Sequence, residues 1–279
     1  MWRHSIILKK DEIDTIAIGG FDGIHVAHKT LIDKTGEKGA VVIIDKNYAN
    51  LTPNSYRCFY IDQPCIFIDL SKIKDLSGEE FVKLLTKEFP NLKKIVVGYD
   101  FRFGKNRSKD ANDLKKLFDG EVEIVKEIKI DGISVHSKTI RELLKKGDLK
   151  TAKKLLGRNY SIFGNVIKGL GIGSKELYPT INLSTGNFLL PKEGVYATFS
   201  KIDDKTFPSV TFIGKRETID GSFSIETHIL DRFDLKDIKT VEVIFVEYLR
   251  ENKKFKDLQN LKKQIEEDIK EAKKILKVS

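Results

Sequence analysis

The chain has 279 residues, of which 40% are hydrophobic, and this supply of apolar side chains excludes a wholly disordered protein. Its net charge of +9 raises the question of a nucleic-acid partner. The lysines alternate with acidic and apolar residues, however, as in KLLTKEFPNLKK, a pattern more typical of a solvated surface. We therefore expect anionic small molecules such as nucleotides, and not nucleic acid, as partners.

The two cysteines, Cys58 and Cys65, are too few for a zinc cluster and give no basis for a disulfide framework. The apolar run at the N-terminus is shorter than a signal peptide needs. No stretch approaches the roughly 18 consecutive apolar residues of a membrane span. We expect a cytoplasmic protein without a membrane partner.

The first half of the chain alternates strand-like and helix-like segments. Short apolar runs ending in Gly or Asp, typical of buried parallel strands, occur at residues 15–20, 40–45, 65–70 and 94–100. A helix is expected between the last two runs, at 77–89, where Ser77 and Glu80 predict a capping box. A further helix and strand follow at 111–120 and 122–128. This alternation predicts an α/β layer with a parallel sheet.

The second half has a different pattern. Residues 137–156 are expected to form two helices, broken at Gly147 and Asp148. Beyond Gly157, β-rich runs follow one another at a spacing typical of an antiparallel barrel or sandwich. The runs cover residues 160–167, 194–200, 209–213, 223–230 and 240–249. The chain ends with an amphipathic helix at 255–276, and we expect two domains, 1–156 and 157–279.

The turn after the first strand carries the first candidate site. Gly19, Gly20 and Gly23 let the backbone approach a ligand closely, and the helix that follows offers free N–H groups to a phosphate. His25 and His28 lie three residues apart, so both rings can face one side of the first helical turn and donate to a phosphoryl oxygen. Asp22 would repel phosphate and is expected to hold the turn or a metal. Taken alone, the H-x-x-H pattern also fits a metal pair or a structural role.

Three segments of the first half resemble one family. The run FDGIHVAH resembles the F-D-G-x-H-x-G-H signature of nucleotidylyltransferases, and in particular of the bacterial bifunctional riboflavin kinase/FMN adenylyltransferases, or FAD synthetases. VGYDFRFG resembles the family's G-x-D-F-x-F-G, and VHSKTIREL resembles its S-S-T-x-I-R segment. The resemblance implies a Rossmann-like domain that joins FMN to the adenylyl group of ATP with Mg²⁺ and releases pyrophosphate.

This resemblance also assigns roles to individual residues. It implies that His25 and His28 are catalytic. It implies that ATP and its phosphates are bound by Gly19, Gly20, Phe21, Gly23, Ser137 and Arg141. It implies that the flavin is bound by Asp100, Phe101 and Phe103.

The second half carries motifs that resemble riboflavin kinases. Gly169, Gly171 and Gly173 alternate in a loop that fits either a phosphate-binding loop or a flexible hairpin. PTIN resembles the family's P-T-A-N motif, which implies that Thr180 and Asn182 are oxygen ligands of Mg²⁺ bound with ATP. IETHILD resembles the block that holds the general base, which assigns that role to Glu226, and YLRENKKF places Arg250 on the flavin side. The resemblance implies a riboflavin-kinase-type β-barrel.

The chain departs from the family pattern at several positions. In the first half, Ala27 and Lys138 differ from the family's motifs. The loop after the second strand lacks the family's usual proline pattern. In the second half, Ser174 and Leu177 differ beside the glycine loop. We expect an enzyme that phosphorylates riboflavin to FMN and adenylylates FMN to FAD. The alternatives are a riboflavin kinase with an impaired adenylyltransferase domain, or a non-catalytic sensor that binds flavin or nucleotide. The oligomeric state stays open.

Overall fold

The computed structural model describes residues 8–46, 48, 50–168, 178–231 and 238–278. The chain divides into two compact units, residues 1–139 and 140–279, which are described separately below. The expected domain boundary at Gly157 stays a prediction.

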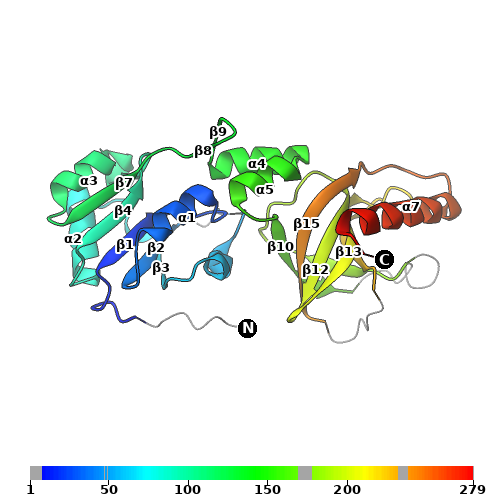
Figure 1. Ribbon diagram of the computed structural model, residues 1–279, viewed down its shortest axis with the longest axis horizontal. Helices are drawn as coiled ribbons and strands as arrows, with labels where there is room; N and C mark the ends of the chain where they lie inside the picture. Colours follow the sequence, from blue (N-terminus) through cyan, green and yellow to red (C-terminus); the bar gives the residue numbers. More distant parts are fainter. Residues whose placement is uncertain (1–7, 47, 49, 169–177, 232–237, 279) are drawn as a thin grey trace. The chain divides into compact units, whose positions relative to one another are not determined.

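The first unit is built on a parallel sheet with the strand order β3-β2-β1-β4-β7 (Figure 1). Its strands are β1 (Thr15–Gly19), β2 (Gly39–Asp45), β3 (Cys65–Asp69), β4 (Lys94–Gly98) and β7 (Glu121–Val125). The middle strand, β1, pairs in parallel with both β2 and β4. Covered on both faces, it consists of apolar residues almost throughout, as parallel strands usually do. The expected parallel α/β layer is confirmed.

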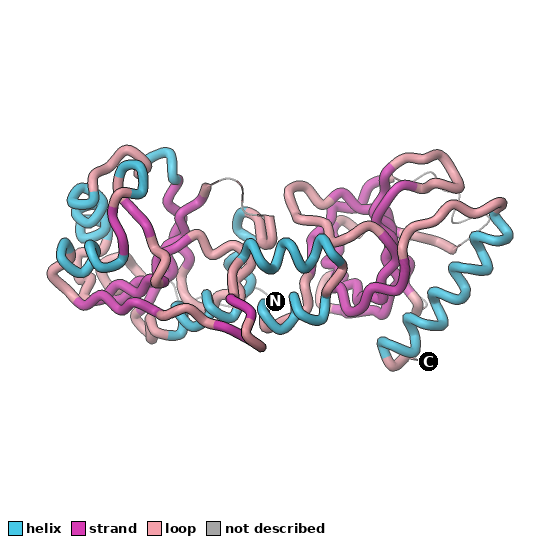
Figure 2. Tube along the Cα trace, turned by 90° about the horizontal axis from the view of Figure 1, so that it is seen from above, coloured by secondary structure: helices cyan, strands magenta, loops and turns pink. Residues whose placement is uncertain are grey.

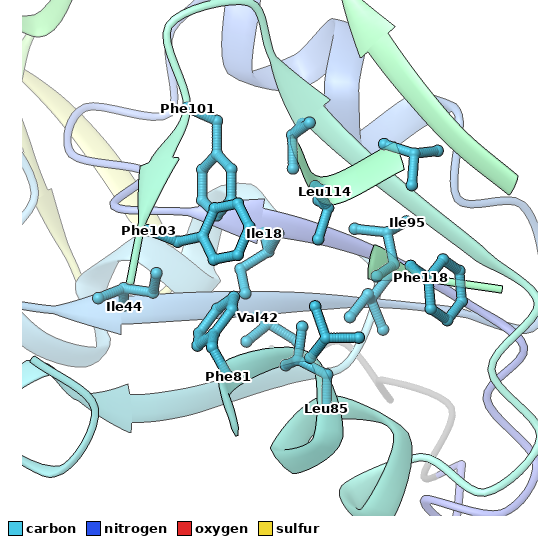
Figure 3. Close-up of a cluster of buried hydrophobic side chains, with 14 of the residues drawn as sticks. Ile18, Val42, Ile44, Phe81, Leu85, Ile95, Phe101, Phe103, Leu114 and Phe118 are labelled. Atoms are coloured by element: carbon cyan, nitrogen blue, oxygen red, sulfur yellow. The ribbon is translucent and has the colours of Figure 1, made fainter. Parts of the chain in front are cut away.

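Helices cover both faces of this sheet. On one face α2 (Gly78–Glu88) and α3 (Ala111–Leu117) pack against a core that includes Phe81, Phe103 and Ile18 (Figure 3). On the other face α1 (Val26–Asp33) packs against a second cluster. The capping box is confirmed, because Ser77 and Glu80 exchange side-chain-to-backbone hydrogen bonds at the start of α2. The remaining elements of the unit are β5 (Arg102–Phe103), β6 (Lys109–Asp110), β8 (Lys129–Ile130), β9 (Ile133–Ser134), η1 (Asn54–Tyr60), η2 (Leu70–Lys72) and η3 (Lys105–Arg107).

The second unit is a closed antiparallel barrel (Figure 2). Its strand order is β10-β11-β14-β13-β12-β15. Its strands are β10 (Ser161–Ile167), β11 (Ile181–Ser184), β12 (Gly194–Ile202), β13 (Lys205–Lys215), β14 (Phe223–Ile229) and β15 (Thr240–Arg250). The expected barrel is therefore confirmed. The sequence did not predict β11, which has only four residues.

The helices of the second half also follow the expected pattern. Helix α4 (Ser137–Lys146) and helix α5 (Leu149–Leu156) are separated by Gly147, which has φ 80°, and by the N-cap Asp148. The terminal helix α7 (Leu258–Leu276) packs its Ala272 and Leu276 against apolar residues on the outside of β12 and β13. This packing explains the apolar stripe of an otherwise highly charged helix.

Five hydroxyl side chains form a closed ring of hydrogen bonds inside the barrel. Thr198 and Ser200 of β12 bond to Ser209 of β13 at 2.8 Å each. Thr227 of β14 bonds to Ser200 at 3.1 Å and to Thr211 at 2.9 Å, and Thr211 returns to Thr198 at 2.8 Å. All five residues are fully buried. Each hydroxyl can both donate and accept within the ring, so these polar groups lose contact with water without losing their hydrogen bonds.

We expect Thr211→Val to destabilise the barrel by about 1–3 kcal/mol, because the substitution preserves the shape of the side chain but leaves Thr198 and Thr227 with a missing partner. Urea unfolding followed by far-UV circular dichroism measures the effect. The matched control is Thr206→Val on the exposed part of the same strand, which should change stability by less than about 0.5 kcal/mol. Equal effects of the two substitutions would contradict an energetic role for the ring.

Candidate active sites

The first candidate site is the turn between β1 and α1, at the carboxyl edge of the parallel sheet. β1 ends at Gly19 and α1 begins at Val26, so His25 is the N-cap residue of the helix. Its Nδ1 accepts a hydrogen bond from the backbone N–H of His28 at 3.3 Å. An accepting Nδ1 leaves the proton of the neutral ring on Nε2, which can then donate to a ligand.

The two histidine rings lie face to face. Their centroids are 3.5 Å apart and their planes differ by 15°. The ring of Phe21 meets His28 edge-on, with centroids 5.1 Å apart. His25 and Phe21 are buried, so the imidazoles are held in place before any ligand arrives. The side chain of Phe21 serves packing in this structure, and its expected contact with ATP stays a prediction.

The glycines of this turn do not all have the same role. Gly23 has φ 94°, a conformation that favours glycine, whereas Gly19 and Gly20 are not in the left-handed region. A Cβ added to Gly20 would meet no atom within 4 Å, but one on Gly19 would touch the Phe21 ring at 3.4 Å. Open space beside Gly20 is consistent with close approach of a ligand.

Asp22 holds the backbone of a neighbouring loop. Its carboxylate accepts hydrogen bonds from the N–H groups of Asn50, Leu51 and Thr52 at 3.0–3.3 Å. Of the two roles open to Asp22 from the sequence, this geometry favours holding the turn. Among the described residues no group of three or more His, Cys, Asp or Glu side chains is arranged to hold a metal.

Ser137 lies at the same turn, where its hydroxyl donates to the carbonyl of Asp22 at 2.7 Å. Its lone pairs stay available to accept, but its proton is already used. Arg141 lies one turn further along α4, in the second compact unit. The phosphate-binding roles of Ser137 and Arg141 stay predictions.

The residues expected to bind flavin in the first unit differ in exposure. Phe101 and Phe103 are buried in the core on the α2 side of the sheet, with stacked rings 5.7 Å apart (Figure 3). Their side chains therefore serve packing in this structure, and a flavin contact through them stays a prediction. Asp100 is exposed after β4 and offers a free surface to a ligand.

The second candidate site is a pocket on the outside of the barrel. Thr180 and Asn182, which are neighbours in the sequence, line it together with the distant Glu226. Asn182 on β11 is directly opposite Glu226 on β14, and the hydroxyl of Thr180 donates to the Glu226 carboxylate at 3.4 Å. The strand pairing thus gathers three oxygen-bearing side chains at one end of the pocket.

Two further residues of this end were not assigned roles from the sequence. Arg216 places its Nη1 3.4 Å from the Glu226 carboxylate and is itself held by Asp220. His228 makes a 2.8 Å hydrogen bond from its Nδ1 to the carbonyl of Pro179. Since a carbonyl only accepts, Nδ1 must carry the proton. Burial lowers the pKa of His228 below its ordinary value, so the ring is neutral at pH 7.

The two-residue repeat of side-chain direction along a β-strand could have shown that His228 belongs to the pocket. Residues two apart on a strand share a face, so His228 had to face the same side as Glu226. Both residues line the pocket, while Thr227 between them faces the barrel interior.

The other end of the pocket is built around Arg250. Its guanidinium donates to both carboxylate oxygens of Asp268, at 2.7–3.1 Å, and lies 5.7 Å from the ring centre of Phe255. Val195, Val210 and Phe212 supply an apolar wall between the two ends. Gly169, Gly171 and Gly173, together with Ser174 and Leu177, lie outside the described residues.

The helices of the described chain are all too short or too polar to cross a membrane.

Comparisons with known proteins match both units. A family model described as FAD synthetase matches residues 40–139, and one described as riboflavin kinase matches residues 156–276. The chain is also similar to a crystal structure described as a macrolide-efflux protein from Streptococcus pneumoniae, with a TM-score of 0.82 and 27% identity over 94% of each chain. That description applies to the neighbour and not to this chain.

Curated relatives cover nearly the full length. A bifunctional riboflavin kinase/FMN adenylyltransferase from Haemophilus influenzae is 30% identical over 92% of each chain. The enzyme of the same description from Buchnera aphidicola subsp. Schizaphis graminum is 31% identical over 93% of each chain. The chain therefore belongs to the bifunctional riboflavin kinase/FMN adenylyltransferase family.

Proposed function

We propose that the barrel pocket phosphorylates riboflavin with Glu226 as general base, and that the β1–α1 turn adenylylates FMN with His25 and His28. The first step makes FMN and the second makes FAD, as the family's description implies. The observation that carries the proposal is the meeting of Thr180, Asn182 and Glu226 in one pocket. The expected cytoplasmic location stays a prediction.

In the kinase step, Glu226 accepts the proton of the riboflavin 5′-hydroxyl as that oxygen attacks the γ-phosphorus of ATP, and ADP leaves. The side chain of Glu226 is 20% exposed, so it can reach a substrate without being fully solvated. Arg216 orients the carboxylate from one side and Thr180 from the other. We propose that the Arg216 cation, which lies 3.4 Å from the Glu226 carboxylate, also offsets negative charge on the phosphates.

The donor set at this end fits a divalent cation. The Thr180 hydroxyl and the Asn182 amide oxygen are hard oxygen donors of the kind Mg²⁺ prefers. With so few protein ligands, most of the remaining coordination would come from ATP and water. When bound, Mg²⁺ would neutralise charge on the transferring phosphoryl group. The flavin ring would lie against the apolar wall, with Arg250 and Phe255 at its far end.

In the adenylyl-transfer step, the FMN phosphate attacks the α-phosphorus of ATP and pyrophosphate leaves. His25, through its Nε2–H, and His28 donate to oxygens whose charge grows in the transition state. The N-terminus of α1 adds a favourable dipole. Arg141 is proposed to bind the departing phosphates, as the resemblance implies. The residues act by positioning and by stabilising charge, without a covalent intermediate.

We expect Glu226→Gln to lower the rate of FMN formation about 10²–10⁴-fold, because the amide cannot accept the hydroxyl proton. FAD formation from supplied FMN should persist at its normal rate. Chromatography of products from riboflavin and ATP, and separately from FMN and ATP, measures both. The control is Glu247→Gln on the exposed part of β15, which should leave both rates unchanged. An unaffected kinase rate in Glu226→Gln would refute the assigned base.

We expect His28→Ala to lower the rate of FAD formation from FMN about 10²–10³-fold, since one donor to the developing charge is lost. The rate of riboflavin phosphorylation by the same purified chain serves as the internal control and should not change.

The products of the wild-type chain test the two alternative functions. If the wild-type chain makes FMN but never FAD, the first unit is impaired and the kinase-only alternative holds. If it binds flavin without consuming ATP, the sensor alternative holds.

We expect His228→Phe to lower kinase kcat/KM about tenfold, because the Pro179 carbonyl loses its donor and the adjoining Thr180 shifts. Phenylalanine keeps the ring that packs beside Tyr178, whose centroid lies 5.2 Å away. His228→Asn, whose amide nitrogen replaces Nδ1, should restore most of the activity. Steady-state kinetics compares them, and equal activity of the two variants would exclude a role for this hydrogen bond.

A further inference from the structure

The β1–α1 turn has an unfavourable backbone conformation at two of its residues. Phe21 has φ 50° and Ile24 has φ 39°, and neither is a glycine. The left-handed region is most unfavourable for β-branched side chains such as that of Ile24. Gly23, with φ 94°, lies between them. Such a conformation persists only where the surrounding structure holds it, and it is often found at functional sites.

Residues 50–57 hold the turn through reciprocal hydrogen bonds. The backbone N–H groups of Leu51 and Thr52 donate to the Asp22 carboxylate at 3.0 Å each. In return, the N–H of Gly23 donates to the hydroxyl of Thr52 at 2.8 Å. Thr52 is 1% exposed, so water cannot replace these bonds. Thr52 therefore holds the turn at two successive residues, Asp22 and Gly23.

A buried arginine fixes the turn at a third position. The Arg57 side chain is 1% exposed and donates from Nη1 to the carbonyl of Gly20 at 3.0 Å. Its Nε donates to the carbonyl of Asn54, also at 3.0 Å, and its Nη2 forms an ion pair with Asp45 at 3.1 Å. Arg57 thus connects the turn to η1 and to the end of β2, which belongs to the rigid sheet.

We infer that Thr52 and Arg57 are positioning residues for adenylyl transfer. They hold the strained turn so that His25, His28 and the open side of Gly20 are correctly placed for the reacting phosphates. The inference rests on the proposed function of the turn. Neither residue needs to touch a substrate, because each acts on the backbone that carries the catalytic residues.

The central test compares Thr52→Val with Thr52→Ser in the full-length chain. Valine keeps the shape but cannot accept from Gly23, and a misplaced turn should lower kcat for FAD formation from FMN and ATP about 10- to 100-fold. Serine retains the hydroxyl and should restore the rate to within about threefold. Arg57→Lys keeps the charge but cannot bridge the Gly20 and Asn54 carbonyls together, and should lower the same kcat about tenfold.

A matched control separates positioning from loss of stability. Thr35 is another buried threonine of the first unit, and its hydroxyl donates to the carbonyl of Ile32 at 2.7 Å, away from the turn. Thr35→Val should lower the melting temperature about as much as Thr52→Val does while leaving the rate of FAD formation within about twofold of normal. Kinase rates measured on the same samples should not change in any variant.

The outcomes distinguish this inference from the proposed function. A normal rate of FAD formation in Thr52→Val, with His28→Ala inactive, would overturn the inference alone. Equal loss of FAD formation in Thr52→Val and Thr35→Val would also overturn it, because stability would then explain both. A wild-type chain that makes no FAD would overturn the proposed function of the turn, and the inference with it.

Discussion

The alternation of side chains along β14 is the constraint on which the proposed kinase site depends. Three consecutive residues, Glu226, Thr227 and His228, point alternately out of the barrel, into it and out again. The inward hydroxyl of Thr227 belongs to the buried ring, which ties β14 to β12 and β13. The outward pair faces the pocket, where one residue is the proposed base and the other holds the backbone before Thr180. A shift of register by one residue would exchange the two sets and remove both functions.

In the first unit, a turn and not a strand positions the proposed catalytic side chains. Parallel strands end at a common edge, and the helix that starts there presents its N–H groups to a ligand. The residues between strand and helix have an unfavourable backbone conformation, and hydrogen bonds from residues 50–57 stabilise it. In both units, therefore, the proposed catalytic groups lie on backbone that other buried polar groups keep in place.

Much of this arrangement could be predicted because it depends on local patterns. Apolar runs marked the parallel strands, Ser77 and Glu80 marked a helix start, and the spacing of His25 and His28 implied that their rings share one side. Polar contacts between residues distant in the sequence could not be predicted from local patterns. The partners of Arg57 lie up to 37 residues away, and the five-hydroxyl ring arises only when three strands are paired. Strand β11 was missed because four residues carry too little periodicity.

The departures from the family pattern in the first unit are compatible with an active site. Ala27 replaces a glycine of the signature, but it lies inside α1 and outside the left-handed region, so a glycine is not required there. Within a helix, alanine is more favourable than glycine by roughly 1 kcal/mol, which strengthens the short α1 that carries His28. The altered loop after β2 is the same segment that holds the turn through Thr52 and Arg57. These buried contacts keep the turn in the conformation that the proposed adenylyl transfer requires.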